Sequence, residues 1–230
     1  LLPRRAEGLD RRLPTVGTGG YEWQGYLSVQ EHPHTTAGRY GLLRNWNNQS
    51  APGFMHGDDD PYGSVHRVEL FDQFPDRVTL ANDVSVMNRS ATEDVRSPVW
   101  PVVSEVLHGS AAPNPLAARV VDVLDEWVAR DAPTLDADNS GQNDDAGPVI
   151  MNALWNPVAD AVMRPVFGDL IPDLDRIRGL GGLSGESYVD KDLRTLLNPG
   201  AVQGAFRLRY CGNGSLDACR ASLWAAVDQV

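Results

Sequence analysis

The spacing of apolar residues changes about a quarter of the way along the chain. The first sixty or so residues are rich in Gly, Pro, Asn and His, and only the stretch 38–46 alternates weakly, which predicts an extended segment. From Ser64 onward, apolar residues recur at spacings of three and four, which predicts helices. We therefore expect a mainly α chain with two parts, an extended segment over residues 1–62 and a helical domain over residues 63–230.

Three of the expected helices have recognisable starts. Thr79, Asn114 and Ser215 each come directly before a run of helical spacing. Their side-chain oxygens can accept hydrogen bonds from the free N–H groups of a first helical turn. The clearest run follows Asn114, begins with a proline in the favourable first position, and carries apolar residues at Leu116, Val120, Val123, Leu124, Trp127 and Val128.

Prolines interrupt two other apolar runs. Pro98 and Pro101 lead us to expect a separate or kinked helix from Val99 to Leu107. Pro157 and Pro165 fall inside the apolar run that follows residue 148. Because proline lacks a backbone N–H, we expect this region to be divided into short pieces.

Composition and charge narrow the possible partners. Acidic residues (31) outnumber Lys and Arg (20), for a net charge of −11, so neither nucleic acid nor an anionic membrane is an expected partner. No apolar run approaches the roughly 18 residues of a membrane span.

The chain begins without Met or a signal segment and ends inside a helical pattern. We interpret it as part of a longer protein.

The two cysteines are Cys211 and Cys219, separated by a segment that contains Gly-Asn-Gly. A disulfide across this short loop suits an exported protein, and the glycines would let its ends meet. The alternative is two free buried thiols. A metal site is not expected, because two thiols without a neighbouring histidine supply only half of a zinc shell.

The polar stretch from Asp136 to Asp144 imitates the start of an EF-hand calcium loop. Oxygen-bearing side chains occupy its first, third and fifth positions, and Gly141 occupies the sixth. The twelfth position is Gly147, where an EF-hand needs a bidentate glutamate. We therefore favour a polar loop between helices.

Four landmarks follow one another over the first 67 residues. They are Gly-Leu-Asp-Arg-Arg-Leu-Pro at 8–14, Gly-Thr-Gly-Gly and Trp-Gln-Gly within 17–25, Asn-Trp-Asn-Asn at 45–48 and Gly-Ser-Val-His-Arg at 63–67. Their order resembles the β-chain interior of the penicillin acylase family, most closely its actinobacterial branch. The resemblance continues more weakly through the helices. It implies the helical insertion domain of an Ntn (N-terminal nucleophile) hydrolase, with extended segments of an αββα sandwich that missing chain completes.

The same resemblance implies roles for three residues. Asn47 corresponds to the side-chain donor of the oxyanion hole, which can stabilise developing negative charge without losing or gaining a proton. Arg67 corresponds to an arginine that holds this asparagine and orients the substrate. Asp58 matches, by its spacing to Arg67, one ligand of a structural calcium ion, although a solvated acidic turn is an equal alternative. No organic cofactor is implied.

The implied activity is hydrolysis of the side-chain amide of a β-lactam or another small N-acyl compound through an acyl-enzyme. The partners would be the remaining α- and β-chain segments of the same precursor, in a secreted or periplasmic protein. Residue 1 is Leu, so the N-terminal nucleophile is absent and residues 1–230 alone are expected to be inactive. The alternative is a non-catalytic helical scaffold or binding module. Burial of Trp127, Trp155 and Trp224 would weaken that alternative.

Overall fold

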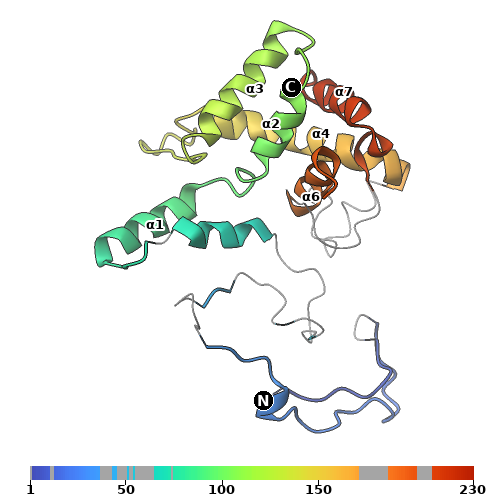
Figure 1. The fold of residues 1–230 in the computed structure, drawn as a ribbon. Helices are drawn as coiled ribbons and strands as arrows, with labels where there is room; N and C mark the ends of the chain where they lie inside the picture. The colour runs from blue at the N-terminus through green and yellow to red at the C-terminus, as the bar shows by residue number, and fades with distance from the viewer. Residues whose placement is uncertain are drawn as a thin grey trace. The chain divides into compact units, whose positions relative to one another are not determined.

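The structure is a computed structural model that divides into two compact units, Leu1–Gly63 and Ser64–Val230 (Figure 1). It describes residues 2–10, 13–36, 43–45, 51, 54, 65–73, 75–170, 186–200 and 209–230. Within the described helices, the side chains of Val65, Arg67, Leu70, Gln73, Glu186 and Ser187 are outside the description.

The first unit is held by a short antiparallel pairing between its start and the residues near 25. The backbone N–H of Arg4 donates to the carbonyl of Gly25, and that of Gln24 donates back to the carbonyl of Arg4, both at 2.8 Å. Pro3 and Tyr26 form an isolated bridge within this pairing. The carboxylate of Glu31 accepts from the Arg4 guanidinium, and this hydrogen bond holds the pKa of Glu31 at about 2.

The second unit is helical, which confirms the expected mainly α class. Among the described residues, the only regular elements of either unit are helices. In chain order they are η1 (Val29–Glu31), η3 (Val65–Gln73), α1 (Leu80–Thr92), α2 (Trp100–His108), α3 (Pro115–Val128), α4 (Gly147–Phe167), η4 (Gly168–Leu170), α6 (Glu186–Leu197), η6 (Cys211–Gly214) and α7 (Leu216–Val227).

The three predicted helix starts are confirmed. Thr79, Asn114 and Ser215 are the residues before α1, α3 and α7, and each has extended backbone angles. Each side-chain oxygen accepts a hydrogen bond from the backbone N–H three residues later, at 3.4, 2.9 and 3.3 Å respectively. Helix α2 begins one residue after the predicted start.

The predicted division at Pro157 and Pro165 is wrong. Both prolines lie inside one continuous helix, α4, of 21 residues. Their missing hydrogen bonds are outweighed by burial, because one face of the helix is enclosed by its neighbours. The buried residues of this face are Met151, Leu154, Trp155, Val158, Ala159, Val162 and Met163.

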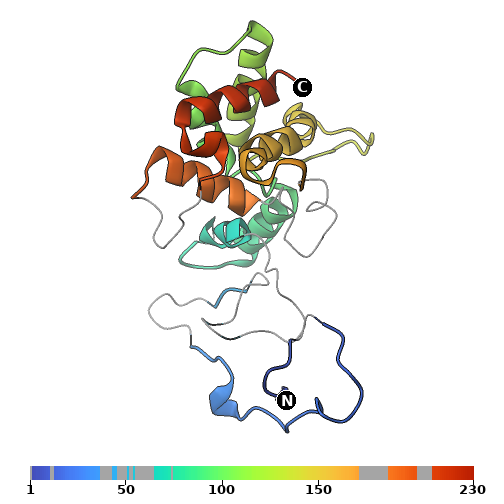
Figure 2. The same cartoon turned by 90° about the vertical axis from the view of Figure 1, so that its right-hand side faces the viewer.

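Helices α2, α3, α4, α6 and α7 surround the core of the second unit (Figures 1 and 2). Trp127 of α3 is fully buried at its centre, and its indole Nε1 donates to the carbonyl of Pro133 at 3.0 Å. Gly147, the first residue of α4, lies against this indole: a Cβ there would stand 2.2 Å from Trp127 Cγ. The absent side chain thus allows α4 to start directly on the Trp127 ring.

Arg220 of α7 caps the C-terminal end of α2. Its Nε donates to the carbonyl of Val106 at 2.8 Å, and its Nη1 donates to the carboxylate of Asp217 at 2.8 Å. The guanidinium occupies the space beside Gly109, where a Cβ would stand 2.3 Å from Nη2. The bond to Val106 ties α7 to α2, and the bond to Asp217, within α7, holds the guanidinium in place.

The predicted disulfide between Cys211 and Cys219 is confirmed, and both cysteines are fully buried. The buried carboxylate of Asp192 in α6 holds the start of this loop, because it accepts the backbone N–H groups of Tyr210 at 2.8 Å and Cys211 at 2.9 Å. Burial raises the pKa of Asp192, and these two hydrogen bonds act in the opposite direction.

Candidate functional site

The residues predicted from the resemblance are only partly described. Asn47 and Asp58 lie outside the described residues. The backbone of Arg67 lies in η3, while its side chain lies outside the description. Their proposed roles therefore remain predictions. The described part of the candidate site is helix η3, which carries the backbone of Arg67, together with the element that packs against it.

Helix η3 packs against α6 through His66. The His66 side chain is only 3% exposed. Its Nδ1 lies 3.1 Å from Oε2 of Glu69, one turn later in η3, and its Nε2 lies 3.7 Å from Oδ2 of Asp190 in α6. The other oxygen of Asp190 accepts from Nε of Arg194 at 2.6 Å. His66 belongs to the Gly-Ser-Val-His-Arg landmark, but no role was predicted for it, because a single histidine has no partner at catalytic or metal-ligand spacing in the sequence.

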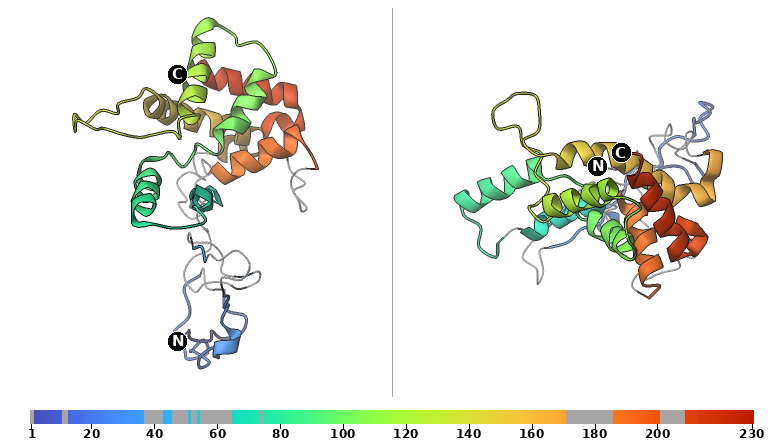
Figure 3. Two further views of the ribbon diagram at one scale, coloured as in Figure 1. Left: turned by 60° about the vertical axis from the view of Figure 1, so that its left-hand side comes forward. Right: turned by 90° about the horizontal axis from the view of Figure 1, so that it is seen from above.

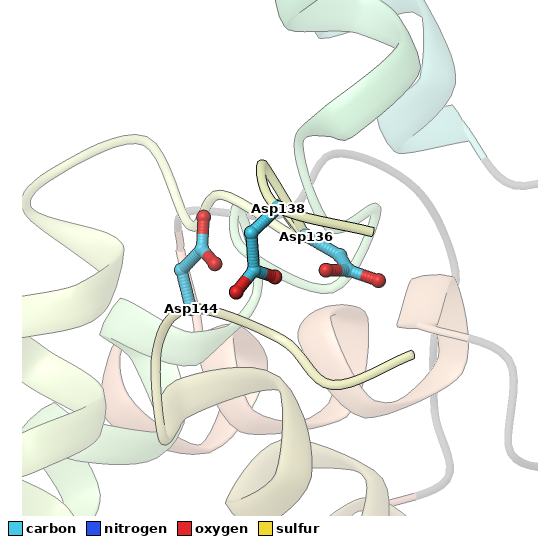
Figure 4. A group of neighbouring side chains, drawn as sticks. All are labelled: Asp136, Asp138 and Asp144. Carbon is cyan, nitrogen blue, oxygen red and sulfur yellow. The ribbon is translucent and has the colours of Figure 1, made fainter. Parts of the chain in front are cut away.

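A second cluster of acidic side chains lies in the loop between α3 and α4, which projects from the helices (Figure 3). Asp136, Asp138 and Asp144 each bring one carboxylate oxygen within 4.8 Å of the other two (Figure 4). The oxygens of Asp136 also accept from the backbone N–H groups of Ser140 at 2.9 Å and Gly141 at 2.8 Å. The loop is therefore folded around its first aspartate.

Hydrogen bonding favours the ionised form of one member of the cluster, Asp138. The Ser140 hydroxyl and its backbone N–H lower the pKa of Asp138, which is fully exposed. Such oxygens are ligands for hard cations such as calcium. The loop nevertheless lacks the closing glutamate of an EF-hand, because Gly147 instead begins α4 and donates its N–H to Asp145 at 3.0 Å. Asp144 was missed as a cluster member, although it stands at the ninth position of the EF-hand spacing.

The first unit carries exposed aromatic side chains. Tyr21, Trp23 and Tyr26 are all exposed, and the Arg5 guanidinium lies 5.0 Å from the centroid of the Trp23 ring. A cation over an indole face is favourable but weak at an exposed site, on the order of 0.5–1 kcal/mol. These rings are a surface feature of the segment that carries the family landmarks.

Comparison with known proteins identifies the family. The family model described as penicillin amidase matches residues 1–226. The chain belongs to the penicillin amidase family. The match includes both units of this amidase-family chain and extends to one residue before the end of α7.

Two relatives show how much of a family protein this chain represents. It is 27% identical to penicillin G acylase of Escherichia coli over 134 residues, which is 54% of this chain and 15% of that protein. Its fold is similar to that of a thermostable penicillin G acylase from Alcaligenes faecalis, with a TM-score of 0.62 and 21% identity. That likeness covers 98% of this chain and 42% of the solved one. The chain thus spans less than half the length of either relative. In the described part of the chain, no helix has the length and apolar character needed to cross a membrane.

Proposed function

We propose that residues 1–230 are part of an amidohydrolase that cleaves the amide bond of a small N-acyl compound, such as a β-lactam side chain, through an acyl-enzyme. The observation that carries this proposal is membership of the penicillin amidase family over residues 1–226. The nucleophile would be an N-terminal Ser, Thr or Cys outside these residues. Its own α-amine would act as the base, because an α-amine has a pKa near 8.

In this proposal Asn47 donates its side-chain N–H to the oxygen that becomes negative as the amide carbonyl is attacked. Arg67 holds Asn47 and orients the substrate, because a guanidinium offers a planar and permanently charged set of donors. The acyl group passes to the nucleophile as the amine leaves, and water then releases the acid. Residues 1–230 alone would therefore be inactive.

The calcium and the location of the protein are also part of the proposal. Asp58 would supply one oxygen to a structural calcium ion, and the other ligands would come from other segments of the precursor, since calcium takes six to eight oxygens. The Cys211–Cys219 disulfide supports an exported protein, secreted or periplasmic, because disulfides persist in oxidising compartments.

A binding module without catalytic activity is disfavoured for the helical unit. That alternative needs exposed tryptophans, whereas Trp127, Trp155 and Trp224 are all buried against neighbouring helices. In the described part of the first unit, Trp23 is exposed, but a single indole with a guanidinium beside it is weak support for a binding surface.

The test uses the complete protein that contains residues 1–230. N-terminal sequencing of its mature chains should reveal a newly exposed Ser, Thr or Cys upstream of residue 1. A panel of N-acyl 4-nitroanilides, including the phenylacetyl compound, should be hydrolysed. Asn47→Ala should lower kcat by about 100- to 1000-fold, the usual effect of removing one oxyanion donor.

Asn88→Ala is the matched control, because Asn88 is exposed on α1 and lies outside the landmarks. It should leave kcat unchanged. An unprocessed protein that hydrolyses none of the anilides would overturn the amidase proposal. A processed and active protein in which Asn47→Ala matches Asn88→Ala would overturn only the role of Asn47.

A further inference from the structure

The contact between η3 and α6 adds a residue to the proposed site. Helix η3 is a nine-residue 3-10 helix, and helices of this type have poor hydrogen-bond geometry over more than a few residues. Its conformation and direction must therefore depend on what it packs against. Helix α6 packs against η3.

Helix α6 is a firm support for this contact. Its residues Val189 and Leu193 are fully buried in the core of the second unit, and the buried Asp192 ties the helix to the disulfide loop. Asp190 stands on the same helix with its side chain 13% exposed, and Arg194 holds one of its oxygens. The second oxygen of Asp190 is the one that faces His66.

The buried His66 side chain thus has one carboxylate at each ring nitrogen. Glu69 faces Nδ1 from within η3, and Asp190 faces Nε2 from α6. Nδ1 lies within hydrogen-bond distance of Glu69, whereas Asp190 stands 3.7 Å from Nε2, which is the distance of an ion-pair contact and not of a hydrogen bond. His66 is therefore a fixed point of η3, and the next residue in the chain is Arg67.

We propose that His66, through its contact with Asp190, is the positioning residue that fixes the backbone carrying Arg67. This inference rests on the proposed function, since Arg67 has its role only there. The position of this backbone affects the reaction rate, because a misplacement of about 1 Å at a group that orients substrate can cost on the order of 100-fold in rate. His66 itself would not touch the substrate.

The test is a double-mutant cycle in the complete protein, with kcat and KM measured on the best anilide substrate. We expect His66→Ala to lower kcat/KM about tenfold, mainly through kcat, and His66→Gln to remain within about threefold of wild type, since its amide can still donate toward Asp190. In an Arg67→Ala background, His66→Ala should have no further effect, because coupled residues are not additive. Thermal melting checks that each variant folds.

His108→Ala is the matched control. His108 also pairs with an aspartate on another helix, Nε2 to Asp125 Oδ2 at 2.8 Å, but its side chain is 57% exposed. It should leave kcat/KM unchanged. If His66→Ala fails to fold, Asp190→Asn takes its place in the cycle with the same expected coupling.

The remaining outcomes distinguish failure of the positioning role of His66 from failure of the proposed amidase function. A further tenfold loss in the Arg67→Ala background, or full activity of His66→Ala, would overturn the positioning role and leave the amidase intact. If His66→Ala lost activity while Arg67→Ala stayed fully active, the positioning role would also be overturned and the amidase proposal would stand. Absence of hydrolysis by the wild-type protein would overturn the proposed function itself.

Discussion

The contact between Gly147 and Trp127 leads to a quantitative prediction. A Cβ added at Gly147 would stand 2.2, 2.3 and 2.6 Å from Cγ, Cδ2 and Cδ1 of the Trp127 indole. Real Cβ atoms do not approach other atoms so closely, so either α4 or the indole must move. Trp127 is fully buried and its Nε1 is bonded to Pro133, so it has no free direction in which to shift.

Gly147→Ala therefore combines two opposed effects. Alanine favours the helix by up to about 1 kcal/mol over glycine. Overpacking of a filled core typically costs about 1–3 kcal/mol, and occasionally more. Because the overlap is severe, we expect the packing effect to dominate and the free energy of unfolding to fall by about 2 kcal/mol. For a unit of this size the Tm should fall by about 4–8 °C.

The assay is urea unfolding followed by far-UV circular dichroism, together with a thermal melt. Gly200→Ala is the control, because the nearest atom to a Cβ there is Asn198 Oδ1 at an ordinary 3.6 Å. It should change stability by less than about 0.5 kcal/mol, as surface substitutions usually do. If Gly147→Ala were as stable as wild type, α4 would not be seated on the indole and the packing argument would be refuted.

Three further predictions concern the disulfide and two carboxylates. Replacing Cys211 and Cys219 together with Ser should lower the free energy of unfolding by about 2.5 kcal/mol, from the chain-entropy effect of a loop of this length, and an unchanged urea midpoint would contradict this. Because burial raises the pKa of Asp192, the folded state binds more protons than the unfolded state from about pH 4 up to the raised pKa, so stability should fall as pH rises through that window. Asp192→Asn should flatten this slope in urea unfolding between pH 4 and 7, and a slope equal to that of wild type would count against the assignment. Glu31 should titrate near pH 2 by NMR and move toward 4.5 in Arg4→Gln; a titration already near 4.5 in the wild type would exclude the Arg4 hydrogen bond in solution.

The helix starts could be predicted from the sequence because their signals are local. Thr79, Asn114 and Ser215 each act on the turn that follows them, so a few residues carry the whole signal. The short loop between Cys211 and Cys219 was predictable for the same reason. The mainly α class followed from apolar spacing, which is also a local property.

The course of α4 could not be predicted in the same way. Pro157 and Pro165 are local signals for a break, but the burial that holds the helix together comes from other helices, among them α7, which begins only at Leu216. The contact of His66 could not be predicted for a similar reason, since its partner Asp190 lies more than a hundred residues later in the chain. The family resemblance, by contrast, was recognisable from the order of short motifs and needed no contact information.

The fit between Gly109 and Arg220 bears on how the sequences of relatives can diverge. Any side chain at position 109 would collide with the guanidinium, and withdrawing the guanidinium would leave the carbonyl of Val106 without that donor. Neither position can change alone without loss, so we expect them to covary among homologues. Lineages that acquire a side chain at 109 should carry a smaller residue at 220 and should cap the end of α2 by some other donor.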